Sequence, residues 1–462
     1  SMLGILSEIR GERATKLSLA YLGALITSSV CGTQYLFSAY STALADRLGF
    51  NSVQINTIGS AINYGTYLSG PISGYIVDNY GPRRTCFFSS FFIFTGYFCL
   101  AMTYGGVFPS SSFLLCALYL LLAGMASSAA FNSSLVTVAR NFVSNRGIAF
   151  GFPVALFGLS AFIFAQINNI IFTRDTYDFL IFLAIATGLS MLVGSLFLVA
   201  MPIEGELVVS AERTDRISET RSGPSFSNNE GDLEVDRTED APLIPKKRSL
   251  TYIQEPDIGG WELFNNRDAL FLCITLFLLG GTGLMYINNV GAIIKSLYLN
   301  SSENSNPNVL NGFSEEMTQE IQRLQNLHVS LLSISSCFGR ISAGIFSDIT
   351  RNLYNIRRII YIILSGIYLF IGHFLAGFMV KSLGMLYPVT ILVGLGFGTI
   401  FSIAPTITSE WFGSRRFGLN WGIMSMFPAF GGQLFNFIFG FNSDLHQGKC
   451  SGDECYNKAF YF

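Results

Sequence analysis

Charge is scarce in this chain. Only 13% of its 462 residues are aspartate, glutamate, lysine or arginine, and the net charge at pH 7 is −2. Soluble domains usually carry about 25% charged residues, so the composition does not fit a soluble globular protein. The near-neutral balance also argues against nucleic acid as a partner, because nucleic-acid-binding surfaces are strongly basic.

Patterns typical of catalytic and metal sites are missing as well. The chain has three histidines, and none is spaced to complete a Ser-His-Asp triad, a Cys-His pair or a metal-ligand set: His328, His373 and His446. We therefore expect no enzyme activity, no metal and no cofactor. His373 falls within an apolar run, where packing inside a helix is a more common role than proton transfer.

Acidic residues are absent from the middle of the apolar runs. Asp46, Asp78, Asp348 and Glu410 all fall near the ends of such runs. Transporters that couple to protons or sodium usually keep a carboxylate near the middle of the membrane. The sequence therefore gives no support for coupling through a carboxylate.

Apolar residues are abundant, at half of the total, and the mean hydropathy is +0.46. Runs long enough to cross roughly 30 Å of hydrocarbon fall at 17–42, 52–77, 85–107, 112–137, 148–172 and 178–201, then at 269–297, 325–347, 358–381, 385–409 and 417–441. This pattern predicts an all-α membrane protein of two helix bundles, the second truncated before a twelfth span. We expect a cytoplasmic N-terminal segment at 1–16, a six-helix bundle at 17–203, a linker at 204–266 and a second bundle at 267–462.

The lysines and arginines predict the orientation of the spans. With the N-terminus in the cytoplasm, 21 of the 28 lie in segments on the cytoplasmic side and 7 lie on the other side. Positive charge collects on the cytoplasmic side of membrane proteins, so we expect a cytoplasmic N-terminus.

A short motif occurs once in each half of the chain. Gly74 and Asp78 lie one helical turn apart in GYIVDNYGPRR at 74–84, and Gly344 and Asp348 have the same spacing in GIFSD. A glycine lets a neighbouring helix approach, and charged residues at a helix end can hold it there. The repeat predicts a conformational gate at the cytoplasmic end of a transporter. Its candidate residues are Gly74, Asp78, Gly81, Arg83, Arg84, Arg340, Gly344 and Asp348.

Uncharged polar side chains within the apolar runs are candidates for contacting a solute. Each is costly when it faces lipid, so we expect most of them to face the bundle interior or a water-filled cavity. Hydrogen bonding between helices is an equally good explanation for any single amide. The candidate pathway residues are Gln34, Tyr35, Asn63, Tyr286, Asn288, Asn289 and Gln433.

The linker is rich in serine, glutamate, aspartate, arginine and asparagine over 204–258. We expect it to be disordered on the cytoplasmic side, because it has too little apolar surface to fold. Within it, Glu239 lies four residues before Leu243 and Ile244, the spacing of an acidic dileucine sorting signal. Chance is an equal alternative, since short motifs are common in such linkers. A genuine signal would bind an adaptor protein and direct the chain to a vacuolar or lysosome-like membrane.

Two features fall on the side predicted to face away from the cytoplasm. Cys450 and Cys455 flank four residues of a loop there, where a disulfide is favoured and two free thiols are the alternative. Asn300 begins an Asn-Ser-Ser sequon for N-glycosylation. Both sites agree with the predicted orientation.

The motif at 74–84, its copy at 344–348 and Arg146-Gly147 resemble the pattern of the major facilitator superfamily, over essentially the whole chain. More narrowly, three segments are similar to nodulin-like carriers and to the fungal monocarboxylate-transporter-homologue branch: 32–40, 283–291 and 417–422.

The resemblance implies two six-helix bundles that work by alternating access and, for fungal members, a vacuolar membrane. It also implies an inner latch in which Asp78 acts with Arg83 and Arg84, and a partner set of Arg340 and Asp348. The second copy lacks a Gly-x-Arg step after Asp348, and its nearest following cations are Arg351, Arg357 and Arg358.

Two functions follow as hypotheses. The first is secondary active or facilitative transport of a small polar or organic solute across a lipid bilayer. The second is a non-transporting membrane sensor or scaffold that signals through the linker. Deleting the linker separates them, because a transporter keeps its flux while a sensor loses its output.

Overall fold

The computed structural model describes residues 2–108, 112–143, 145–172, 175–201, 256–305, 315–444 and 457–460. The sorting motif (Glu239, Leu243, Ile244) and the cysteine pair (Cys450, Cys455) lie outside these residues. Asn300 lies within a helix, and its side chain is not among those described.

The described residues form helices and connecting turns, with no strand among them. The first half contains α1 (Met2–Cys31), η1 (Thr33–Ala39), α2 (Ser41–Leu48), α3 (Ser52–Leu68), α4 (Gly70–Tyr80), α5 (Pro82–Tyr104), α6 (Phe113–Asn141), α7 (Arg146–Ile171) and α8 (Thr176–Phe197). The second half contains α10 (Trp261–Asn265), α11 (Arg267–Thr275), η2 (Leu276–Gly280), α12 (Gly281–Ser305), α13 (Glu315–Tyr354), α14 (Ile359–Phe378), α15 (Leu383–Phe412), α16 (Phe417–Met424), α17 (Met426–Asp444) and η5 (Asn457–Phe460).

Ten helical segments of the described residues are long and apolar enough to cross a membrane. The predicted all-α membrane fold is therefore confirmed. The predicted run 52–77 is not among the ten, because the chain divides it into α3 and α4 at Ser69. Pro71 lies in the first turn of α4, where its missing amide hydrogen is not needed for a helical hydrogen bond.

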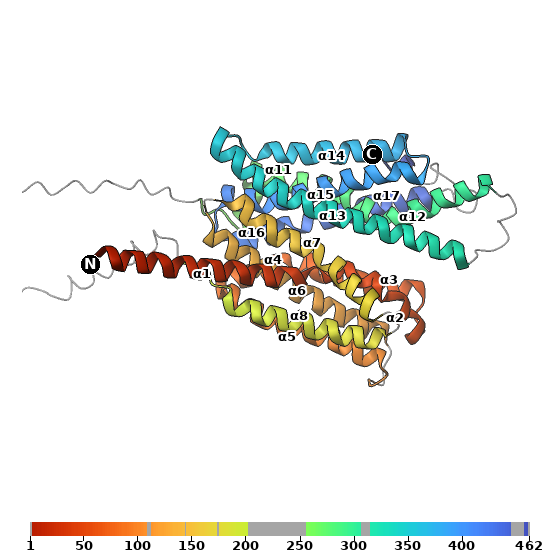
Figure 1. Cartoon of the computed structure of the whole chain (residues 1–462), viewed down its shortest axis with the longest axis horizontal. Helices are drawn as coiled ribbons and strands as arrows, with labels where there is room; N and C mark the ends of the chain where they lie inside the picture. Colours follow the sequence, from red (N-terminus) through yellow and green to blue (C-terminus); the bar gives the residue numbers. More distant parts are fainter. Residues whose placement is uncertain are drawn as a thin grey trace, which may run out of the picture. The chain divides into compact units, whose positions relative to one another are not determined.

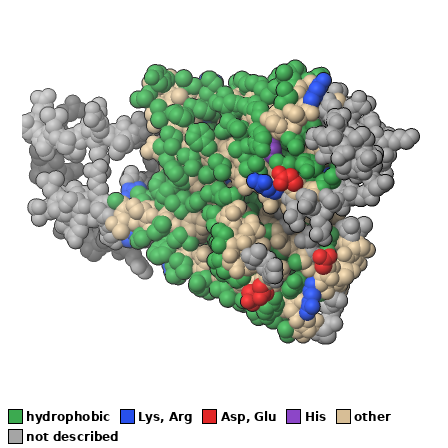
Figure 2. Space-filling view, turned by 45° about the vertical axis from the view of Figure 1, so that its right-hand side comes forward, with side chains coloured by type: hydrophobic (Ala, Val, Ile, Leu, Met, Phe, Trp, Pro, Cys, Tyr) green, Lys and Arg blue, Asp and Glu red, His purple; other side chains and the backbone are tan. Residues whose placement is uncertain are grey.

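The outer surface fits a lipid environment. Large apolar side chains such as Ile170 (77% exposed), Phe370 (70%) and Phe437 (69%) point outward from the helices. Hydrophobic side chains cover most of the face shown in Figure 2, and only a few charged side chains are visible there. In water such a surface would be costly, whereas hydrocarbon chains solvate it.

The helices of each half pack mainly on one another, and the two halves meet along a few helix pairs. Across this interface α13 packs on α7, α16 on α4, and α15 on α7. Figure 1 shows the first half in red to yellow and the second in green to blue, with α4, α7 and α16 where the halves meet.

The turn between α4 and α5 depends on a glycine. Gly81 has a φ angle of 88°, a positive value that residues other than glycine rarely adopt. Pro82 then begins α5, so that Arg83 and Arg84 lie on its first turn with exposed side chains. The predicted motif residue Gly81 is thus a turn residue, and it redirects the two arginines away from α4.

The structure describes the last part of the predicted linker, from residue 256 to residue 266, and this part packs on the second half. Ile258 donates its backbone N–H to the carbonyl of Phe412 at 3.2 Å, and Asn420 donates from Nδ2 to the carbonyl of Ile258 at 2.8 Å. The helix α10 follows directly. Because these backbone groups are bonded to α15 and α16, the second half begins near residue 257.

Candidate functional site

A carboxylate at the end of α4 caps a helix of the other half. The Oδ1 atom of Asp78 accepts from the backbone N–H of Gly418 at 3.1 Å, and its Oδ2 accepts from Leu419 at 2.8 Å. Both amides belong to the first turn of α16, whose N-terminal N–H groups have no acceptor within the helix. The negative charge also lies against the positive end of the α16 dipole.

Arg140, from the end of α6, completes this contact. It donates to Oδ1 of Asp78 at 3.2 Å and to the backbone carbonyl of Arg415 at 2.9 Å. The arginine therefore bridges an acid of the first half and the loop before α16 in the second half. We refer to Asp78, Arg140, Gly418 and Leu419 as the α4–α16 clasp.

The same arrangement occurs with the halves exchanged. Asp348, near the end of α13, accepts from the backbone N–H of Gly147 at 3.0 Å and of Ile148 at 2.7 Å, in the first turn of α7. Arg358 donates to Oδ1 of Asp348 at 2.5 Å and to Glu410 at 2.8 Å. We refer to Asp348, Arg358, Gly147 and Ile148 as the α13–α7 clasp.

Glycines bring the paired helices into backbone contact at both clasps. A Cβ atom at Gly74 would overlap the carbonyl oxygen of Gly418, and one at Gly422 would overlap that of Gly70. At the second clasp, a Cβ at Gly344 would lie 2.5 Å from the carbonyl oxygen of Gly147. Only glycine allows the helices to approach closely enough for the acids to reach the amides.

The structure changes the partners that the resemblance implies. Asp78 pairs with Arg140 instead of Arg83 and Arg84, and neither of those two takes part in an ion pair within the described residues. Asp348 pairs with Arg358, one of the cations noted after it in the sequence. The partner cations are carried by neighbouring helices, which the motif itself does not reveal.

Arg340 lies away from both clasps. It is eight residues before Asp348 on α13, or about 12 Å along the axis, within a segment able to cross the membrane. Its side chain is buried and donates from Nη1 to the carbonyl of Val154 on α7 at 2.7 Å. A Cβ at Gly158 would overlap the guanidinium, so this glycine makes room for it.

The surroundings of Arg340 are polar but contain no acidic partner among the described residues. Tyr35 and Tyr67 lie near its guanidinium, and its Nε atom has no hydrogen-bond acceptor among the described residues. The Tyr35 and Tyr67 hydroxyls bond each other at 2.8 Å, and Gln34 donates to the Tyr67 hydroxyl at 3.4 Å. The Oε1 atom of Gln34 is buried and accepts no hydrogen bond from the part of the chain that the structure describes.

These groups form the candidate binding site between the halves, which we call the Arg340 site. Gln34 and Tyr35 come from η1, Tyr67 from α3 and Arg340 from α13. A buried, uncompensated guanidinium is costly unless an anion or strong acceptors accompany it. The planar guanidinium can donate two parallel hydrogen bonds to two oxygens of a carboxylate or phosphate.

Only two of the predicted pathway residues join this site. Tyr286 and Asn289 instead form bonds within the second half, Tyr286 to Thr390 at 2.7 Å and Asn289 to Asn436 at 2.8 Å. Asn63 donates to a carbonyl of its own helix, that of Gly59 at 3.3 Å. The side chains of Asn288 and Gln433 are exposed.

Among the side chains of the sites, Tyr67 and Arg140 were not sequence candidates, and Arg358 was noted only as a cation that follows Asp348. The backbone donors of the clasps were not candidates either: Gly147, Ile148, Gly418 and Leu419. Tyr67 lies four residues after Asn63, on the same helical face, and this spacing could have identified it. Arg140 is the single basic residue of α6, in its last turn, and no local motif marks it.

A family model described as Major Facilitator Superfamily matches residues 18–436. Relatives include a protein of Neurospora crassa named probable transporter mch1, 26% identical over 97% of this chain and 86% of that protein. A protein of Candida albicans named probable transporter MCH1 is 26% identical over 96% of this chain and 87% of its own length.

Solved structures with the same fold are transporters as well. One is the proton:xylose symporter XylE, with a TM-score of 0.62 and 12% identity over 97% of this chain and 94% of that one. Another is the human organic anion transporter MFSD10, with a TM-score of 0.60 and 13% identity over 97% of each chain. At these identities the likeness concerns the fold alone.

Proposed function

The chain belongs to the major facilitator superfamily, and on that footing we propose that it carries a small organic anion across a membrane by alternating access. The observation that supports an anionic solute is the position of Arg340. It is a buried guanidinium between the halves with no acidic partner among the described residues. A charge kept in this position is explained if the solute supplies the counter-charge. Gln34 and the paired tyrosines offer further hydrogen bonds to its oxygens.

We propose that the two clasps form the gate of this cycle. In the described conformation they join the halves at one end, with each acid capping a helix of the opposite half. Opening at that end requires both sets of bonds to break, after which water solvates the freed acids and amides. Ligand at the Arg340 site and closure at the clasps then act on the same interface, through α13 and α7.

We further propose a vacuolar membrane and a cytoplasmic N-terminus. The distribution of positive charge supports this orientation, which places the clasps on the cytoplasmic face. The dileucine pattern at Glu239, Leu243 and Ile244 supports the membrane.

The anion proposal is tested by counterflow in proteoliposomes. Purified protein is reconstituted and assayed with a panel of mono- and dicarboxylates, organic phosphates and neutral polyols. We expect uptake of one of the anions, and a loss of at least about 30-fold in Arg340→Gln, because removing one partner of a buried charge pair costs about 2 kcal/mol or more. Arg340→Lys keeps the positive charge but cannot donate two parallel hydrogen bonds, so the loss of uptake should be smaller than in Arg340→Gln.

Arg357→Gln is the matched control, since Arg357 is exposed and outside the interface. Transport of a neutral solute that is unaffected by Arg340→Gln would refute the anionic class and leave transport itself intact. The absence of flux for every solute, in protein that remains folded, would count against transport.

A further inference from the structure

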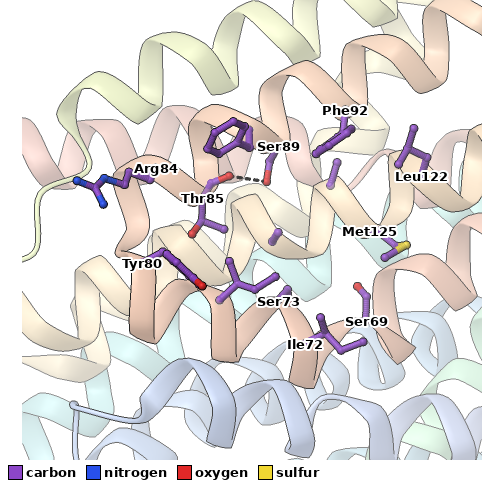
Figure 3. Close-up of a pocket in the computed structure, with 14 residues that line it drawn as sticks. Ser69, Ile72, Ser73, Tyr80, Arg84, Thr85, Ser89, Phe92, Leu122 and Met125 are labelled. Atoms are coloured by element: carbon purple, nitrogen blue, oxygen red, sulfur yellow. Dashed lines mark hydrogen bonds between the residues drawn. The ribbon is translucent and has the colours of Figure 1, made fainter.

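A groove on the outer surface of the first half opens between α4, α5 and α6. Its volume is about 360 Å³. Figure 3 shows the side chains that line it, from Ser69 and Leu122 at one end to Tyr80 and Arg84 at the other. It lies on a different part of the molecule from the Arg340 site.

The interior of the groove is apolar. Its lining includes Ile72 (60% exposed), Phe88 (59%) and Phe92 (44%), and the small residues Ala126 and Ala129 of α6 leave space between them. Apolar side chains this exposed on a helix of a membrane protein face hydrocarbon.

The hydroxyls in the groove do not alter this character. Ser73 donates to the carbonyl of Gly70 at 3.0 Å, and Thr85 donates to that of Gly81 at 2.9 Å. Ser89 donates to the carbonyl of Thr85 at 2.9 Å, the bond that is dashed in Figure 3. These three hydroxyl hydrogens are used close to their own helices, so a polar solute would gain little from them. The hydroxyl of Ser69, at the far end of the groove from Arg84, has no hydrogen-bond partner among the described residues.

One end of the groove is cationic. Arg84 extends from the first turn of α5 beside Tyr80, and Arg83 precedes it. Both arginines are exposed, and neither pairs with an acid in the described part of the chain, because the nearby Asp78 is bound by Arg140 and two amides of α16. Arg84 and Phe92 are eight residues apart on α5, so the apolar part extends about 12 Å from the charge.

We propose that this groove binds an anionic phospholipid, with one acyl chain along Ile72, Phe88 and Phe92 and the headgroup phosphate at Arg83 and Arg84. Arg84 lines one end of the apolar groove, and Arg83 is next to it on the first turn of α5. This arrangement matches a lipid, which has its charge at one end and hydrocarbon beyond it. With the predicted orientation this end faces the cytoplasm, where anionic lipids are concentrated. The bound chain braces α4, the helix that carries Asp78 and Gly74 of the α4–α16 contact.

The test compares lipids on the purified protein in detergent. Bound lipid is counted by native mass spectrometry while phosphatidylserine, phosphatidylglycerol or phosphatidylcholine is added. We expect the two anionic lipids to bind, and Arg83→Gln/Arg84→Gln to weaken binding by roughly 30-fold, since each arginine near an anionic headgroup contributes about one kcal/mol. Arg357→Gln, which removes an exposed charge elsewhere, should leave binding unchanged.

Ala129→Leu tests the apolar part, because it fills the groove without removing charge. Inorganic phosphate at the same concentration should not compete with the lipid, since it lacks the chain. Equal binding of phosphatidylcholine, an unchanged affinity in the double variant, or full competition by phosphate would each overturn the proposal. Neither transport nor the Arg340 site enters the measurement, so the two proposals fail separately.

Discussion

Replacing Asp78 by asparagine should favour opening of the proposed gate at the α4–α16 clasp. The size of the shift in the open–closed equilibrium follows from the bonds that Asp78 makes. The carboxylate accepts two bonds from the first turn of α16 and one from Arg140. Asparagine keeps one acceptor oxygen, but its NH₂ group then faces an amide N–H or the arginine, and the charge against the helix dipole is lost. Loss of a helix cap costs about 0.5–2 kcal/mol and loss of a charge at the dipole about 0.3–1 kcal/mol. We expect a net change near 2 kcal/mol, a shift of about 30-fold toward the open state.

Spin labels at Tyr80 and Arg357, which are exposed positions in different halves, would report the ratio of closed to open molecules as a distance distribution. The native cysteines are replaced beforehand. Asp46→Asn is the control, because Asp46 is an exposed acid outside both clasps. If Asp78→Asn has the wild-type distribution and the same thermal stability, capping of α16 has no part in the gate equilibrium and the reasoning fails.

Two other predictions follow from the same interface and from the linker. Gly74→Ala should shift the same spin-label distances toward the open state, because its Cβ would overlap the carbonyl oxygen of Gly418 and overpacking costs about 1–3 kcal/mol. Gly440→Ala is the control, and it should leave the distances unchanged because Gly440 has open space around it. If the proposed vacuolar location depends on the dileucine pattern, replacing Leu243 and Ile244 by alanine should move a fluorescent fusion from the vacuolar membrane to another membrane. An unchanged vacuolar signal would remove the sorting role.

The sequence predicted the acids of both clasps but not their partners. The four-residue step from Gly74 to Asp78, and from Gly344 to Asp348, places glycine and acid on one helical face, and in the structure both faces meet the other half. Arg140 lies 62 residues after Asp78 in the chain. A bond of that separation depends on how α4 packs on α6, which no local spacing determines.

Arg340 was predicted as a gate residue, and its place on α13 supports a different proposal for its role. The apolar run at 325–347 placed it near the cytoplasmic end, close to Asp348. The helix α13 instead continues from Glu315 to Tyr354, because polar side chains at both ends extend it beyond the apolar part. Arg340 therefore lies about two helical turns from Asp348, where it contacts α7 and lies near Tyr35 and Tyr67.

The strength of the sequence motif and the strength of the contact run in opposite directions. The first copy has the full Gly-Pro-Arg-Arg ending, yet its acid has one cation, and that cation is shared with a backbone carbonyl. The second copy lacks the ending, yet Asp348 is bound by Arg358, which also bonds Ser347 and Glu410, and Arg351 joins Glu410 as well. Arg358 and Asp348 have side chains only 2% and 3% exposed, against 20% and 9% for Arg140 and Asp78. Separating the α13–α7 clasp therefore breaks more bonds, between more deeply buried side chains, than separating the α4–α16 clasp. The two arginines of the stronger motif, Arg83 and Arg84, are left at the surface, at the end of the groove between α4, α5 and α6.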